Sequence, residues 1–250
     1  MTATLRDEVE SNFDAFEKQW PNDLNQALGA LSGSRKRFVD SYLRISTIQA
    51  WRTSVILGNV SEGAEAFFFE AQNDFLISHC LSRCGSFRQA LKALRGGIEN
   101  VYFSLYFKDH PIELAKWEVG RYRISFSELN SYFESHPAVC NSPQGLQSLA
   151  TLKDEYSTLS KAVHGSSKAF RMTQNLTEIH LWDTGVQAVG KWATRESHVI
   201  TSVNVLLCHL FADKLQGAGN RNLREIISLI VSKRQQKEMK DTLKITFPAG

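Results

Sequence analysis

The sequence predicts an all-α protein that folds as an antiparallel helical bundle, and two observations lead to this prediction. Apolar residues recur at intervals of three and four along most of the 250-residue chain, which is the period of an amphipathic helix. Apolar residues make up 42% of the chain and charged residues 22%, with only 5 prolines. This composition supports a sizeable core and carries no signature of disorder.

The N-terminal part of the chain contains two predicted helices. The first, Leu5 to Trp20, is amphipathic, and Pro21 is expected to end it. The second, Val39 to Leu57, continues the helical period until Gly58 and Asn59, a pair typical of a helix C-terminus. We expect both helices to pack on the core of the bundle.

A helical hairpin is predicted next. Its first helix covers Glu62 to Cys80, with Ser61 as N-cap and acidic residues in the first turn. Gly85 and Ser86 mark the turn. The second helix carries the clearest apolar stripe in the chain, formed by Phe87, Leu91, Leu94, Ile98, Val101 and Leu105.

The middle of the chain alternates short helices and loops. Short helices are expected at residues 110–118 and 125–133, followed by a loop at 138–145 that contains two prolines and a glycine. A longer helix is predicted from Leu146 to His164. Residues 172–185 show no clear period, so no structure is assigned to them.

Two helices are predicted at the C-terminal end. A long helix runs from Val186 to Leu215, and a final helix begins after Asn220. Its end, Lys233 to Lys244, has a basic excess, which is typical of a solvated helix terminus and less so of a nucleic-acid-binding arm. The chain thus divides into N-terminal helices packed on the core (1–60), a bundle (61–217), and a C-terminal helix with a basic tail (220–250).

Charge and cysteine content limit the classes of function. The formal net charge of +3 is weak evidence for a polyanionic partner. Cys80 and Cys84 lie one helical turn apart beside His79, but no second ligand pair exists, so buried thiols are expected and neither a metal nor a cofactor is predicted. The first ten residues lack the apolar segment of a signal peptide, and no apolar run approaches the ~18–20 residues of a membrane span. We therefore expect a cytoplasmic protein without a membrane partner.

The stripe helix contains the first group of candidate site residues. Arg95 and Glu99 are four residues apart and share one helix face. Gly96 and Gly97 lie between them, although each glycine costs about 1 kcal/mol in a helix interior relative to alanine. Two explanations are open: close packing of a neighbouring helix, or a shallow pocket beside the guanidinium and the carboxylate.

The second group lies at the end of the helix 146–164. Tyr156, Ser160 and His164 are spaced by four residues and so share one face, with Lys161 beside them. Gly165 is a natural C-cap, which places His164 in the last turn, where the helix dipole favours its protonated form. A histidine in this position is also a common structural choice.

Residues 90–111 and 155–167 together resemble the HEPN superfamily, in particular HEPN-like proteins of prokaryotic defence islands and mobile elements. The resemblance implies a helical bundle that commonly dimerises and, in active members, a metal-independent ribonuclease that uses an arginine and a histidine of one motif helix. His164 matches the histidine. No arginine precedes it at the family's position, where Ser157, Thr158 and Leu159 stand instead.

The resemblance leads to a first functional hypothesis, an RNA-cleaving effector or toxin of an antiviral defence system. His164 would act as the general acid and base, and Arg95 or Lys161 would contact the phosphate. Glu99 would orient one of these groups, and Arg171 lies just beyond the helix.

Two alternatives remain open. One is a non-catalytic binding or adaptor subunit that recognises a nucleotide, a nucleic acid or a partner protein through the same surface, with Tyr156, Ser160, Lys161 and Arg171 as binding residues. Its partners would be RNA or a nucleotide, a second copy of the chain, or a protein of a defence complex. The other alternative is a structural bundle in which Arg95, Glu99 and His164 only tie helices together.

Overall fold

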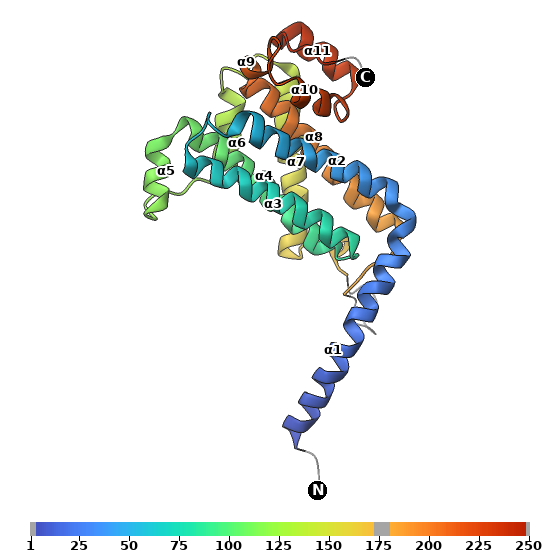
Figure 1. Cartoon of the computed structure of the whole chain (residues 1–250). Helices are drawn as coiled ribbons and strands as arrows, with labels where there is room; N and C mark the ends of the chain where they lie inside the picture. Colours follow the sequence, from blue (N-terminus) through green and yellow to red (C-terminus); the bar gives the residue numbers. More distant parts are fainter. Residues whose placement is uncertain (1–3, 173–180, 249–250) are drawn as a thin grey trace.

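All regular structure of the protein is helical in the part of the chain that the structure describes (Figure 1). The computed structural model describes residues 4–172 and 181–248. The prediction of an all-α helical bundle is therefore confirmed. Residues 173–180, part of the segment without a predicted structure, lie outside the described residues.

The predicted hairpin forms the centre of the bundle. It consists of α3 (Glu62–Arg83) and α4 (Phe87–Asp109), which lie side by side in Figure 1. Ser61 caps α3 by accepting a hydrogen bond from the amide of Ala64. Gly85 makes the turn with a φ of 79°, a conformation that favours glycine. The apolar stripe of α4 is buried at each predicted position: Phe87, Leu91, Leu94, Ile98, Val101 and Leu105.

The two glycines of α4 face α3. A Cβ atom added to Gly97 would lie 2.3 Å from Cε1 of Phe75, and one added to Gly96 would lie 2.7 Å from Oδ2 of Asp74. Both distances are shorter than a real Cβ contact allows. Close packing of the neighbouring helix, the first of the two explanations considered, therefore accounts for the glycine pair.

Three further helices complete the core: α2 (Arg35–Trp51), α7 (Pro143–His164) and α8 (Val186–Leu210). Helix α8 contacts α2, α4 and α7, so it lies across the middle of the bundle. A short π-helical segment, 52–56, extends α2, and the chain leaves it before Gly58 as predicted.

Two fully buried tryptophans join α8 to the N-terminal half of the chain. Trp51 of α2 donates a hydrogen bond from Nε1 to Oδ1 of Asn204, at 2.9 Å. Trp192 of α8 donates one from Nε1 to Oγ of Ser78 in α3, at 3.1 Å. Each indole thus buries its large apolar ring while its N–H group is satisfied.

The smaller helices lie at the ends of the bundle. The predicted short helices are α5 (Pro111–Glu118) and α6 (Phe126–Ser135). At the opposite end of the chain, α9 (Ala212–Leu215), α10 (Arg221–Ser228) and α11 (Lys233–Leu243) gather at the top of Figure 1.

The first predicted helix boundary is wrong. Helix α1 (Leu5–Ala30) continues through Pro21 and extends away from the bundle in Figure 1, with only Ala27 buried. Proline removes one backbone hydrogen bond, and on an exposed helix water can satisfy the carbonyl group that loses its donor. The N-terminal segment 1–60 is therefore not uniform, because α2 packs in the core and most of α1 does not.

Three boundaries in the C-terminal half also differ from the prediction. Helix α7 starts at Pro143 because Ser142 caps it, so Gly145 belongs to the helix. The long helix α8 ends at Leu210. The basic segment 233–244 is not the end of the preceding helix but a separate helix, which starts at a capping box and buries Met239.

The prediction of buried thiols at Cys80 and Cys84 is wrong. Cys80 is exposed and Cys84 is half-buried, because the last turns of α3 lie at the edge of the bundle. Within residues 4–172 and 181–248, no helix combines the length and apolar character needed to cross a membrane.

A buried ionisable network connects α2 with α8. Glu196 is 1% exposed and accepts hydrogen bonds from Nε of Arg44, at 2.7 Å, and from Oγ of Ser41, at 3.0 Å. Burial raises the pKa of Glu196 to about 7, because desolvation of the carboxylate outweighs the attraction of Arg44.

We predict that replacing Gly97 by alanine destabilises the protein by roughly 1–3 kcal/mol, because the methyl group overlaps the Phe75 ring. The control is Gly190→Ala in α8, where no atom lies within 4 Å of the added Cβ. This control should be neutral or stabilising by up to about 1 kcal/mol. Urea unfolding measures both changes. Equal stabilities of the two variants would contradict the close approach of α3 and α4.

We predict that Glu196 lowers stability as the pH rises from 4.5, its ordinary pKa, to about 7. The folded state retains the Glu196 proton in this range and the unfolded state releases it, so unfolding gains from rising pH. The variant Glu196→Gln should therefore compare better with the wild type at pH 8 than at pH 5 in chemical denaturation. Glu118→Gln, at an exposed position of α5, is the control. A wild-type to variant difference that is constant with pH would refute this account.

Candidate functional site

Four of the predicted site residues form one hydrogen-bonded group, which we call the Arg95 cluster: Arg95 and Glu99 of α4, and Tyr156 and Ser160 of α7. The guanidinium binds the Glu99 carboxylate through two parallel hydrogen bonds, Nη1 to Oε2 at 2.9 Å and Nη2 to Oε1 at 3.0 Å. Its Nε donates to Oγ of Ser160 at 3.0 Å, and Nη2 also donates to the hydroxyl of Tyr156. The cluster thus connects two helices that are 57 or more residues apart in sequence.

Tyr156 has contacts on every side of its ring. Its hydroxyl donates to Oε1 of Glu99 at 2.7 Å, and the ring stacks on Phe126 of α6 with centroids 3.6 Å apart. The Arg95 guanidinium lies over the ring, 4.5 Å from its centroid. Burial, together with the hydrogen bond to Glu99, raises the pKa of Tyr156 to about 12. The tyrosine therefore remains a neutral hydrogen-bond donor at physiological pH.

A second polar pair lies next to the cluster on the α3 side. Asn100 donates from Nδ2 to Oδ2 of Asp74 at 2.9 Å, and burial raises the pKa of Asp74. The sequence analysis missed this pair and the stacking partner Phe126. Gly96 is the one signal that indicated it, because a residue without a side chain leaves room for the Asp74 carboxylate.

His164 lies in the last turn of α7, as predicted, and its side chain is exposed. Gly165 follows with a φ of 63°, so it is the left-handed C-cap expected from the sequence. The described residues show no hydrogen bond to the imidazole and none between His164 and Arg95. Ser160 precedes His164 by one turn, so the Arg95 cluster and His164 occupy successive turns of one helix face.

Arg88 of α4 also contacts the end of α7, and the sequence analysis did not select it. Its Nε donates to the carbonyl oxygen of Ala162 at 3.1 Å, and its Nη2 lies beside Gly165. A cation here satisfies a carbonyl group that has no partner within the helix and complements the helix dipole. The remaining predicted residues, Lys161 and Arg171, are exposed.

The geometry limits the chemistry of the cluster. Arg95 and Glu99 neutralise each other, and their side chains are only 21% and 30% exposed. A guanidinium that donates to a carboxylate, a phenol and a serine has little capacity left for a phosphate. Arg95 is therefore better suited to position the end of α7 than to clamp a ligand, while His164 stays accessible to one.

We predict that Tyr156→Phe lowers the free energy of unfolding by roughly 1–3 kcal/mol. The substitution keeps the stacking on Phe126 but removes a hydroxyl that both Arg95 and Glu99 use. Tyr42→Phe is the matched control, because Tyr42 is 60% exposed on α2. Equal unfolding free energies of the two variants in urea would contradict the role of the cluster.

Comparisons with protein-family models, with curated protein sequences and with solved structures gave no match. The resemblance of residues 90–111 and 155–167 to the HEPN superfamily therefore stays a prediction. What the structure adds is that residues from both stretches meet in the Arg95 cluster.

Proposed function

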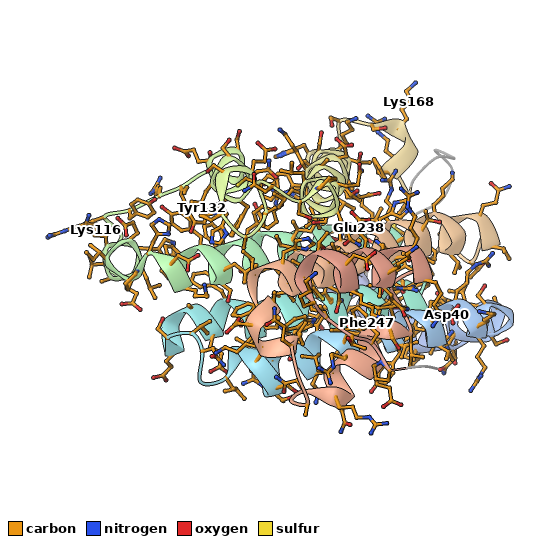
Figure 2. The ribbon with its side chains drawn as sticks, turned by 90° about the horizontal axis from the view of Figure 1, so that it is seen from above. Asp40, Lys116, Tyr132, Lys168, Glu238 and Phe247 are labelled. Atoms are coloured by element: carbon orange, nitrogen blue, oxygen red, sulfur yellow. The ribbon has the colours of Figure 1, made fainter. Side chains whose placement is uncertain are left out.

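We propose that this chain is an RNA-binding, HEPN-like helical bundle that holds RNA at the C-terminal end of α7. The observation that carries the proposal is the charge of residues 161–171. This segment exposes four basic side chains and contains no acidic residue; they are Lys161, His164, Lys168 and Arg171. Figure 2 shows Lys168 at the edge of the bundle, with its side chain directed outward.

The surroundings of the segment support the binding of a polyanion. The C-terminal carbonyl groups of a helix normally repel phosphate, but Arg88 covers one of them, at Ala162. RNA phosphates attract clustered cations without requiring a preformed deep site. The net charge of the whole chain is only +3, so this concentration of positive charge is a local feature.

Binding is favoured over cleavage because of Arg95. In the cleavage hypothesis Arg95 contacts the phosphate, whereas here it is paired with Glu99 and bonded to Ser160. Cleavage remains a second candidate because of His164, whose exposed ring is accessible for proton exchange with a ribose hydroxyl.

We predict that the double variant Lys161→Glu/Lys168→Glu binds a fluorescently labelled single-stranded RNA at least about tenfold more weakly than the wild type. Each lost phosphate contact also lowers the salt dependence, so the slope of log K against log salt should shrink by about 1.4. Fluorescence anisotropy measures both quantities.

The control, Lys116→Glu/Lys240→Glu, changes the charge equally on α5 and α11, far from the end of α7 in the sequence. It should retain RNA binding. The same loss in both double variants would show that only net charge matters and would refute a binding site at residues 161–171.

The cleavage candidate has a separate test. Labelled RNA is incubated with the wild type and with His164→Ala in the presence of EDTA, and the products are resolved on a denaturing gel. Degradation by the wild type alone would assign the acid–base role to His164. Equal survival of the RNA in both samples would leave binding as the function.

A further inference from the structure

A cavity of about 790 Å³ lies between the start of α4, the second half of α7 and the first half of α8. None of the four residues of the Arg95 cluster lines it. The cavity is therefore separate from that cluster, although Arg88 borders both the cavity and the end of α7. Its volume falls within the range of about 300–1,000 Å³ that is typical of small-molecule sites.

The cavity has an apolar wall and a cationic rim. Phe87, Leu91, Phe170, Ala188 and Trp192 form the apolar part. The cations come from different elements: Arg88 on α4, Lys191 and Arg195 on α8, and Arg171 after α7. An apolar wall next to several cations suits a ligand that has a flat, weakly polar body and an anionic end.

A buried carboxylate organises one side of the cavity. Glu155 of α7 is 8% exposed and accepts two hydrogen bonds from α8, from Nη1 of Arg195 at 2.7 Å and from Nδ1 of His198 at 2.9 Å. Because Nδ1 of His198 faces Glu155, its Nε2 is turned away from that carboxylate. The His198 side chain is 53% exposed, so this second nitrogen is accessible to a ligand.

The charge balance of the cavity favours an anion. Glu155 is neutralised by its two partners on α8, and the carboxylate of Asp183 accepts a hydrogen bond from the amide of Gly185. Lys191 is exposed at the rim, and no ion pair of its ammonium group occurs in the described part of the chain. A phosphate near Lys191 and Arg88 would meet two cationic groups from facing helices.

We propose that this cavity binds a nucleoside 5′-monophosphate, with the base against the apolar wall and the phosphate at Lys191 and Arg88. His198, oriented by Glu155, contributes a further hydrogen-bonding nitrogen. Stacking of a base on an aromatic side chain contributes about 1–3 kcal/mol, so the base and the phosphate both add to affinity. The proposal is independent of RNA binding at residues 161–171.

The test is isothermal titration calorimetry of the full chain with AMP, GMP, CMP and UMP, and with adenosine and inorganic phosphate as separate probes. At least one nucleotide should bind about tenfold more tightly than phosphate and than adenosine. Absence of saturable binding for all four nucleotides would overturn the proposal. Equal affinity for phosphate and for every nucleotide would also overturn it, because the apolar wall would then play no part.

Variants locate the site. Lys191→Glu should weaken nucleotide binding by at least about tenfold, whereas Lys153→Glu, an exposed position on α7 outside the cavity, should not. Ala188→Trp fills the apolar half and should abolish binding while far-UV circular dichroism confirms the fold. Unchanged affinity in Lys191→Glu and in Ala188→Trp would place any binding elsewhere. The double variant Lys161→Glu/Lys168→Glu should retain nucleotide binding, which separates this result from a failure of the RNA-binding proposal.

Discussion

Arg95 places a positive charge at the boundary between α4 and α7, where little water is available, and this charge must be paired. Glu99 supplies the opposite charge from the same helix, while Tyr156 and Ser160 supply hydrogen-bond partners from the other. Removal of one partner from such a group leaves a charge without compensation, which costs more than the group contributes when complete. The register of α7 against α4 follows from this requirement.

The position of the functional surfaces depends on that register. Helix α7 carries Tyr156 and Ser160 on one face, Glu155 toward α8, and the basic residues at its C-terminal end. One helix therefore connects the Arg95 cluster, the cavity beside α8 and the proposed RNA-binding segment. The close approach of α3, which Gly97 permits, holds α4 in the place from which Arg95 reaches α7.

The sequence alone predicted most of this framework because its signals are local. The stripe of α4, the cap at Ser61 and the left-handed Gly165 each depend on residues within a few positions of one another. It missed the passage of α1 through Pro21, where solvent exposure removes the usual penalty. The partnership of Glu155 with His198 was also beyond sequence analysis, because 43 residues separate the two and neither belongs to a recognisable motif.

A double-mutant cycle between Arg95 and Tyr156 tests the central claim, that the Arg95 cluster fixes α7 against α4, most directly. The unfolding free energies of the wild type, Arg95→Met, Tyr156→Phe and the double variant are measured in urea. If the cluster acts as one unit, the double variant loses less stability than the two single variants together, with a coupling of roughly 0.5–3 kcal/mol. Additive losses would contradict the account, because they would mean that Arg95 and Tyr156 stabilise the fold independently.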